Sequence, residues 1–139
     1  SGDYRCRHNL IYWQYQDYLG LGLAAASTLA GRRWVNLSDL DAYLSALNTG
    51  RMPTALTETL TPQQEMAEML MLGFRLTTGP DPVAFKRRWG VSLDEVMGER
   101  VKPLLSGGFL QKAAGTYQLT PRGMLVSNQV LTQLLFPLL

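Results

Sequence analysis

Hydrophobic positions in the second half of the chain recur at helical spacing, and a capping side chain precedes each helical stretch. The four predicted helix starts are Thr61-Pro62, Asp81-Pro82, Ser92 and Thr120-Pro121. The third of these helices is expected to span residues 93–106. Between it and the last helix, residues 109–112 and 116–119 are typical of two short strands joined by a turn. This half therefore predicts three helices, a β-hairpin and a closing helix.

The first half begins with a different pattern, in which large and small side chains alternate. Residues 18–23 read Tyr-Leu-Gly-Leu-Gly-Leu, which predicts a buried strand with Gly20 and Gly22 on one face and leucines on the other. We expect a loop over residues 24–31 and a second, more exposed strand over residues 32–37.

A helix is predicted directly after this second strand, because Ser38 is a suitable N-cap and two aspartates follow in the first turn. Its apolar stripe, which we expect to be buried, consists of Leu40, Tyr43, Leu44 and Leu47. Residues 51–60 contain a proline and show no clear period, so they are expected to be a linker. The sequence thus predicts two domains, residues 1–56 and residues 57–139.

The composition is that of a globular protein and narrows the classes of function. Hydrophobic residues make up 46% and charged residues 17% of the 139 positions, and the formal net charge is +2. That charge is too small to indicate nucleic-acid or membrane binding through the field of the whole protein. The single cysteine, Cys6, excludes an internal disulfide and a metal site made of several cysteines. No transmembrane run and no signal peptide are visible, so we expect a cytoplasmic protein.

The candidate binding residues gather near the start of the chain, in residues 6–27. His8, the only histidine, precedes four aromatic side chains that fall within seven positions. It is a candidate heme or metal ligand or proton shuttle, and the alternative is a structural hydrogen bond. Gly20 and Gly22 either leave room for a bound group or allow close packing of another element. A methionine stripe of the second half is interpreted as core rather than as thioether ligands: Met66, Met69 and Met71.

The helices and the hairpin of the second half are similar to a winged helix, which makes nucleic-acid binding one function to consider. The helix that would enter a groove, residues 93–106, carries three acidic and two basic side chains, and the hairpin offers only Lys112. DNA recognition requires a net basic helix that neutralises phosphates. The cluster Lys86-Arg87-Arg88 is interpreted as the solvated face of an amphipathic helix. We therefore favour a packing or docking module.

Two groups of short motifs occur in a specific order along nearly the whole chain. The first group is Cys6-Arg7-His8-Asn9, Tyr12-Trp13 and Tyr18-Leu19-Gly20-Leu21-Gly22, followed by Ala25 and Ser27. The second group is Leu60-Thr61-Pro62-Gln63-Gln64-Glu65, Leu72-Gly73-Phe74-Arg75, Gly79, Phe85, Trp89-Gly90, Gly108-Phe109-Leu110, Leu119-Thr120-Pro121-Arg122-Gly123 and Asn128. Together they resemble the C-terminal region of the oxygen-independent coproporphyrinogen III oxidase-like radical SAM proteins. The spacing is most similar to the branch that includes the heme chaperone.

The resemblance implies that this chain is the C-terminal part of a longer protein. Family members bind a [4Fe-4S] cluster and S-adenosylmethionine through a Cys-x3-Cys-x2-Cys loop in an N-terminal barrel. This chain has one cysteine and no such loop, so by itself it is expected to hold no cofactor and to be non-catalytic. The resemblance places Gly20, Gly22 and Ala26 next to S-adenosylmethionine in the complete protein. At the position of Ala26 many relatives have a larger or polar residue, so the chain departs from the pattern there.

The expected fold class is α+β, with a mainly helical C-terminal module and a winged-helix-like hairpin after a strand-containing remnant of a radical SAM barrel. In the complete protein, we expect this chain to cover the cavity of a coproporphyrinogen III oxidase or of a heme chaperone in porphyrin metabolism. The expected partners are the missing barrel of the same chain and a porphyrinogen or heme, with no nucleic acid. Without the barrel, the exposed aromatic stretch favours self-association or local disorder. The alternative is a stand-alone winged-helix-like module that binds a protein or a nucleic acid.

Overall fold

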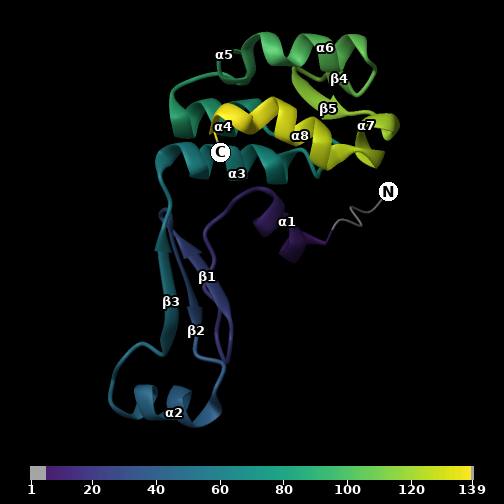
Figure 1. The fold of residues 1–139 in the computed structure, drawn as a ribbon. Coiled ribbons are helices and arrows are strands. Elements are labelled where there is room, and N and C mark those ends of the chain that lie inside the picture. The colour runs from purple at the N-terminus through teal and green to yellow at the C-terminus, as the bar shows by residue number, and fades with distance from the viewer. Residues whose placement is uncertain (1–5, 139) are drawn as a thin grey trace. The chain divides into compact units, whose positions relative to one another are not determined.

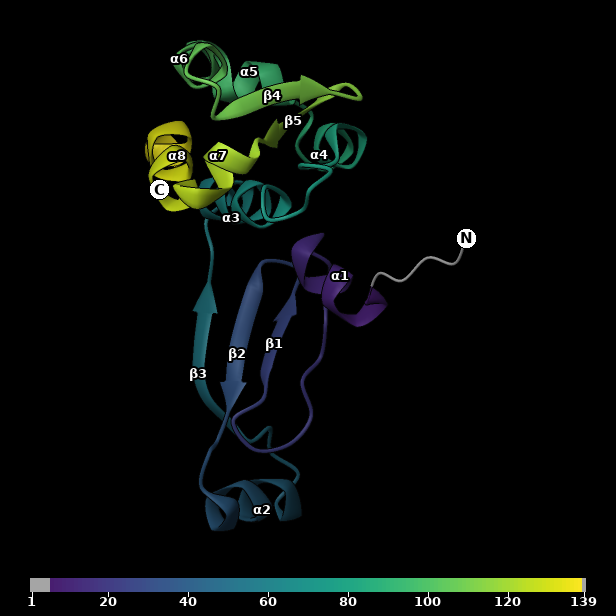
Figure 2. The same ribbon diagram turned by 90° about the vertical axis from the view of Figure 1, so that its right-hand side faces the viewer.

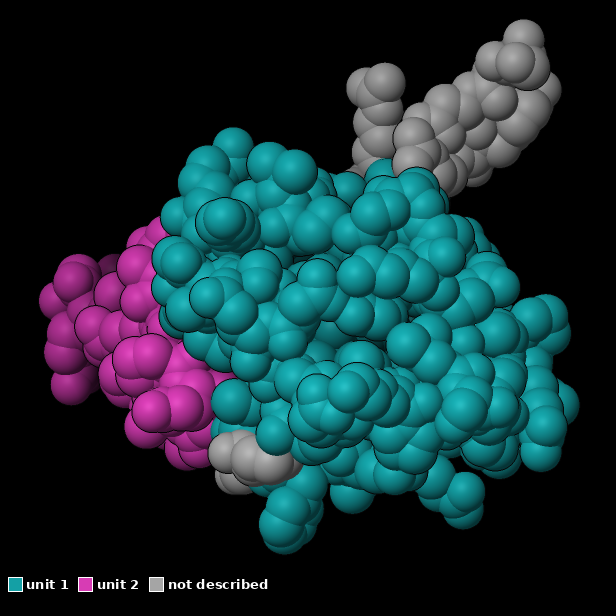
Figure 3. Space-filling model, turned by 90° about the horizontal axis from the view of Figure 1, so that it is seen from above, with its two compact units in different colours: residues 1–15, 66–139 teal, residues 16–65 magenta. Residues whose placement is uncertain are grey.

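The computed structural model describes residues 6–138 and divides into two compact units. Residues 16–65 form the sheet unit, and residues 66–139 together with residues 1–15 form the helical unit (Figure 3). The helical unit is therefore discontinuous in sequence, because the sheet unit is inserted into it. Helices and small antiparallel sheets together confirm the α+β class. The predicted division after residue 56 concerns domains of the complete protein and stays a prediction.

The sheet unit is built on a three-stranded antiparallel sheet in the order β1-β2-β3 (Figure 2). Its elements are β1 (Ala26–Leu29), β2 (Arg32–Asn36), α2 (Leu40–Asn48) and β3 (Thr54–Thr59). The strand predicted over 32–37 is confirmed. The loop predicted over 24–31 and the linker over 51–60 are wrong, because each contains a strand that pairs with β2. Ala30 and Gly31 both have positive φ, which matches the tight hairpin between β1 and β2.

The predicted buried strand over 18–23 does not form. Only Tyr18 pairs in a β-bridge, to Thr28. The chain then turns, since Gly22 has a φ of 101° and Ala24 a φ of 53°. The three leucines of this segment are exposed rather than buried: Leu19, Leu21 and Leu23.

Helix α2 is confirmed as an element, but its predicted cap and buried stripe are wrong. Asp39, not Ser38, is the N-cap, and its carboxylate accepts a hydrogen bond from the Ala42 amide at 2.9 Å. Ala46 is the only residue of α2 that is buried in the described structure. The leucines of the stripe are about half exposed: Leu40, Leu44 and Leu47. The apolar face of α2 is thus open to solvent.

The helical unit stacks its elements in two layers around one core (Figures 1 and 2). The helices of one layer are α3 (Pro62–Gly73), which continues from the sheet unit, α4 (Pro82–Trp89), α7 (Pro121–Leu125) and α8 (Ser127–Leu135). The other layer holds α5 (Leu93–Met97), η1 (Gly98–Arg100), α6 (Val101–Ser106) and the hairpin β4 (Leu110–Ala113) and β5 (Thr116–Leu119). The remaining elements are α1 (Arg7–Trp13) and η2 (Phe136–Leu138).

The predicted helix starts of the second half are confirmed by their cap hydrogen bonds. Thr61, Asp81, Ser92 and Thr120 each accept a hydrogen bond from a backbone amide two or three residues later. The predicted helix over 93–106 is interrupted, because Gly98 takes a φ of 51° between α5 and η1. The last helix likewise breaks between α7 and α8.

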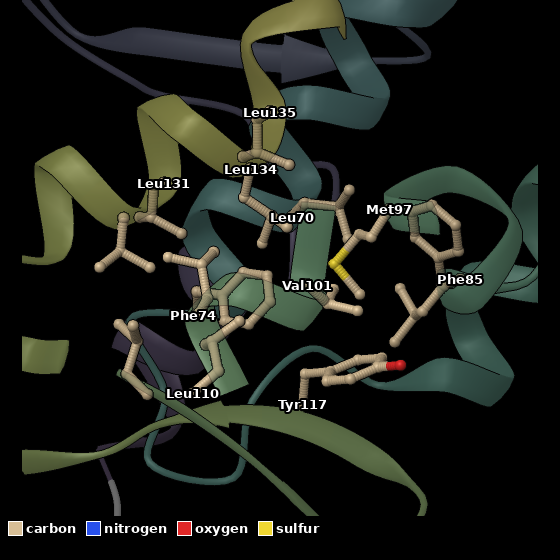
Figure 4. Packing of buried hydrophobic residues seen from close by; sticks show 14 residues of the cluster. Leu70, Phe74, Phe85, Met97, Val101, Leu110, Tyr117, Leu131, Leu134 and Leu135 are labelled. Carbon is tan, nitrogen blue, oxygen red and sulfur yellow. The ribbon is translucent and has the colours of Figure 1, made fainter. Parts of the chain in front are cut away.

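The core of the helical unit lies between its two layers (Figure 4). Its fully buried side chains are Leu70, Phe74, Phe85, Met97 and Leu134. The methionine stripe of α3 packs against this cluster, so the core interpretation of Met66, Met69 and Met71 is confirmed.

Candidate functional site

The segment that carries Gly20 and Gly22 is held by two buried polar side chains of the sheet. Ser27 Oγ accepts a hydrogen bond from the Gly20 amide at 3.0 Å. Asn36 Nδ2 donates to the Gly22 carbonyl at 2.9 Å and to the Gly20 carbonyl at 3.5 Å. A Cβ added to Gly20 would lie 2.2 Å from the Ala26 carbonyl oxygen, whereas one added to Gly22 would meet nothing within 4 Å. The absent side chain of Gly20 therefore serves close packing within the chain itself.

The side chain of Ala26 lies on the opposite face of the sheet. Because strand side chains alternate and Ser27 faces the Gly20 segment, Ala26 points to the other face, together with its cross-strand neighbours. Val35 is paired with Ala26, and Leu56 is paired with Val35. Ala26 and Leu56 are exposed. The three candidate S-adenosylmethionine positions are thus divided between the two faces.

His8 lies on α1, in the other unit, and is exposed. Its Nε2 is 3.2 Å from the Tyr12 hydroxyl, and the two rings meet edge to face with centroids 5.2 Å apart. Tyr12 and Trp13 are each 36% exposed, and the free thiol of Cys6 is exposed. Helix α1 therefore presents an accessible imidazole that contacts the Tyr12 ring, and it also carries the partly exposed Trp13.

Contacts that the sequence did not reveal attach the end of α1 to the rest of the helical unit. The Tyr15 hydroxyl donates to Glu68 Oε2 of α3 at 3.5 Å. The Arg88 guanidinium carbon of α4 lies 5.2 Å from the centroid of the Tyr15 ring and 5.2 Å from that of the Trp89 ring. The Trp89 indole in turn donates to Met69 Sδ at 3.3 Å. No sequence signal identifies the contacts of Tyr15, because Glu68 and Arg88 lie far from it along the chain.

A second polar cluster ties the hairpin to α5. The Asp94 carboxylate accepts hydrogen bonds from the Tyr117 hydroxyl and, at 3.2 Å, from Lys112 Nζ. The Tyr117 and Lys112 hydrogen bonds hold the pKa of Asp94 below its usual value. The bond to Asp94 raises the pKa of Lys112, and burial raises that of Tyr117. At neutral pH the cluster therefore contains a carboxylate, an ammonium and a neutral phenol, and it is a structural tie.

We expect the stability supplied by this cluster to be lost in acid. Because the pKa of Asp94 is lower in the folded than in the unfolded protein, its contribution is present above about pH 4 and disappears as the pH falls below that value. The effect is less than about 1 kcal/mol, since the pair is exposed. Urea unfolding between about pH 5 and pH 3 should show a steeper loss for the parent chain than for Asp94→Asn. Parallel pH curves of the two proteins would contradict this assignment.

The described residues show little sign of metal or membrane chemistry. Within residues 6–138, no three histidine, cysteine, aspartate or glutamate side chains gather into a group that could hold a metal ion. A bilayer-spanning helix of sufficient length and apolarity is likewise not found in that range.

Comparison with known proteins identifies the second half of the chain. Residues 60–126 match the family model described as the HemN C-terminal domain. The match begins at the buried Leu60 and ends between α7 and α8, so it covers most of the two-layered core. The resemblance to the C-terminal region of HemN-like proteins is thereby confirmed.

Curated relatives extend the likeness beyond the HemN C-terminal domain. The heme chaperone HemW of Bacillus subtilis is 30% identical over 124 residues, which cover 89% of this chain and 33% of that protein. HemW of Lactococcus lactis is 27% identical over 95% of this chain and 34% of its own length. The chain thus spans about a third of the length of these relatives.

A solved structure has the same fold. Coproporphyrinogen III oxidase (HemN) from Escherichia coli, a radical SAM enzyme, matches 86% of this chain and 28% of its own length with a TM-score of 0.58. The sequence identity is 19%, so this match bears on the fold alone.

Proposed function

We propose that this chain is the C-terminal part of a HemW-like protein and that it contributes a heme-binding element to it. The observation that carries this proposal is the match of about nine-tenths of the chain to proteins named heme chaperone HemW. Oxidation of coproporphyrinogen, the activity of the HemN structure by its name, is the less favoured alternative, because the identity to that protein is lower. A cytoplasmic location is part of the proposal.

The heme-binding element is α1. Heme is flat and largely apolar, and a histidine nitrogen is a common axial ligand of its iron. His8 offers such a nitrogen at an exposed position, and the partly exposed ring of Tyr12 offers apolar surface beside it. Because the Tyr12 hydroxyl already engages Nε2 of His8, iron ligation at that atom requires this hydrogen bond to break. Tyr12 therefore competes with the iron for the imidazole.

The sheet unit is proposed to pack against a radical SAM barrel elsewhere in the same polypeptide. Its apolar row Ala26–Val35–Leu56 and the exposed leucines of residues 19–23 and of α2 form apolar surface typical of a protein interface. The same surface supports the prediction that the chain alone self-associates. Gly22 and Ala26 leave open space for S-adenosylmethionine contact, whereas the space beside Gly20 is filled by the Ala26 carbonyl.

The cluster chemistry is proposed to reside outside this chain. A [4Fe-4S] cluster with an open iron needs three thiolates, and Cys6 is the only cysteine of the 139 residues. When bound, cluster and S-adenosylmethionine supply radical chemistry. This chain contributes the surfaces that enclose them.

The helical unit is proposed to be a winged-helix-like docking module that binds no nucleic acid. Its hairpin β4–β5 corresponds to the wing. Lys112 of that hairpin is paired with Asp94, and Lys102 of α6 with Glu99 at 2.5 Å. Carboxylates therefore already neutralise two of the lysines that a phosphate backbone would need.

Hemin titration tests the role of His8. We expect the parent chain to give the shifted Soret band of histidine-ligated heme, and His8→Ala to lose it and to bind about tenfold more weakly. Asn9→Ala is the matched control, since it changes an exposed neighbour on the same helix and should leave the spectrum unchanged. Tyr12→Phe should bind slightly more tightly, because it removes the competitor for Nε2. A Soret band that is identical in the parent and in His8→Ala would refute heme ligation by His8.

A further inference from the structure

Helix α1 is too short to be stable by itself. It has seven residues, its N-cap Cys6 makes no side-chain cap hydrogen bond, and its first turn has no acidic residue. Isolated helices below about 12 residues are marginal in water. Contacts with the rest of the helical unit must therefore maintain α1.

The residues just after α1 contact the rest of the helical unit at Arg88. Its guanidinium lies at the same distance, 5.2 Å, from the rings of Tyr15 and Trp89, so one cation faces two aromatic side chains. Glu68 accepts from the Tyr15 hydroxyl and brings α3 into the same cluster. Arg88 thus joins α4 to Tyr15, the second residue after the end of α1.

The backbone at Tyr15 shows that this attachment is specific. Tyr15 has a φ of 53°, a left-handed conformation that residues with a side chain rarely adopt. Such a conformation persists where the surrounding structure determines it. The surrounding structure here includes Arg88, which faces the Tyr15 ring, and Glu68, which accepts a hydrogen bond from the Tyr15 hydroxyl.

We propose that Arg88 is a positioning residue for His8: with Tyr15 and Glu68 it holds α1 on the HemN C-terminal domain in the conformation that binds heme. The claim that Arg88 supports heme binding rests on the proposed heme ligation by His8. The claim that Arg88 holds α1 in place does not depend on it. The consequence is that the histidine belongs to the C-terminal module, so heme binding by this chain needs no barrel residue. If α1 is only partly folded, the apparent heme affinity falls in proportion to the folded fraction.

The test compares Arg88→Ala, Arg88→Lys and Arg87→Ala in the 139-residue chain. Arg87 is the matched control, because it is an exposed arginine on the same turn of α4. The first readout is the ¹³Cα chemical shifts of residues 8–13, with those of α3 as internal reference. The second is the hemin dissociation constant of each variant.

We expect Arg88→Ala to move the shifts of residues 8–13 toward coil values, to leave α3 helical, and to weaken hemin binding about fivefold. Arg88→Lys should restore most of both signals, since an ammonium also binds aromatic faces. Arg87→Ala should match the parent. If Arg88→Ala and Arg87→Ala give equal shifts, the attachment is refuted. If α1 unfolds in Arg88→Ala while hemin binding is unchanged, the positioning role is refuted.

These outcomes are distinct from a failure of the proposed function. If His8→Ala binds hemin like the parent, heme ligation by His8 is refuted, and so is the role of Arg88 in heme binding. The chemical shifts of residues 8–13 in Arg88→Ala would still decide whether Arg88 holds α1.

Discussion

The substitution Gly79→Ala is expected to lower the free energy of unfolding of the helical unit by more than about 3 kcal/mol. A Cβ at this position would lie 2.0 Å from the carbonyl oxygen of Tyr117, which belongs to the backbone of β5 and cannot rotate away. Gly79 also has a φ of 73°, a conformation that disfavours alanine by about 1–2 kcal/mol. The hairpin must therefore move away from the chain that precedes α4.

Gly90→Ala separates the effect of the positive φ from that of the steric overlap with Tyr117. Gly90 has nearly the same φ, 75°, but an added Cβ there meets nothing within 4 Å. Urea unfolding should therefore show a loss of only about 1–2 kcal/mol for Gly90→Ala. Similar losses in the two variants would mean that the close approach of Tyr117 to Gly79 does not constrain the fold.

Phe74→Ala is expected to destabilise the helical unit by about 3–5 kcal/mol. The Phe74 side chain has no exposed surface and lies within the cluster that joins the two layers (Figure 4). Its removal leaves a cavity between α3 and the hairpin layer that rigid neighbours fill only in part.

Phe136→Ala is the control for this prediction. Phe136 is 72% exposed, so the same change of side chain should alter the free energy of unfolding by less than about 0.5 kcal/mol. Chemical unfolding followed by circular dichroism measures both variants. If Phe74→Ala were as mild as Phe136→Ala, the core would not lie where the structure places it.

The helical unit could be predicted well from the sequence because its signals are local. Thr61, Asp81 and Ser92 cap the helices that the residues directly after them form, so each start was found correctly. The break at Gly98 was missed, since a glycine inside a helical pattern does not by itself indicate a positive φ.

The sheet unit was predicted poorly because strand pairing is not local. Residues 54–59 are exposed and show no period, so only their pairing with β2 makes them a strand. Residues 18–23 alternate like a buried strand, yet within the described structure only Tyr18 among them pairs with a strand. The pattern of hydrophobic and polar residues alone does not show which strand a segment pairs with.

The candidate site was predicted in part for the same reason. His8 is recognisable as the only histidine within an aromatic stretch, and the structure keeps it accessible. The contact between Arg88 and Tyr15 joins two distant segments of the chain within the helical unit, and no spacing rule connects them. From the sequence alone, Arg88 and its neighbours Lys86 and Arg87 indicate only the solvated face of an amphipathic helix.

The discontinuity of the helical unit has a consequence for the order of folding. The contact between Tyr15 and Arg88 closes a loop that contains the entire sheet unit, and this loop is longer than those closed by the hydrogen bonds of Thr116 to Pro80 and of Arg75 to Asn128. Closing a long loop costs more chain entropy, and a compact insert reduces that cost by bringing its own ends together. We therefore expect the helix that carries His8 to join the helical unit late, after the sheet unit has folded.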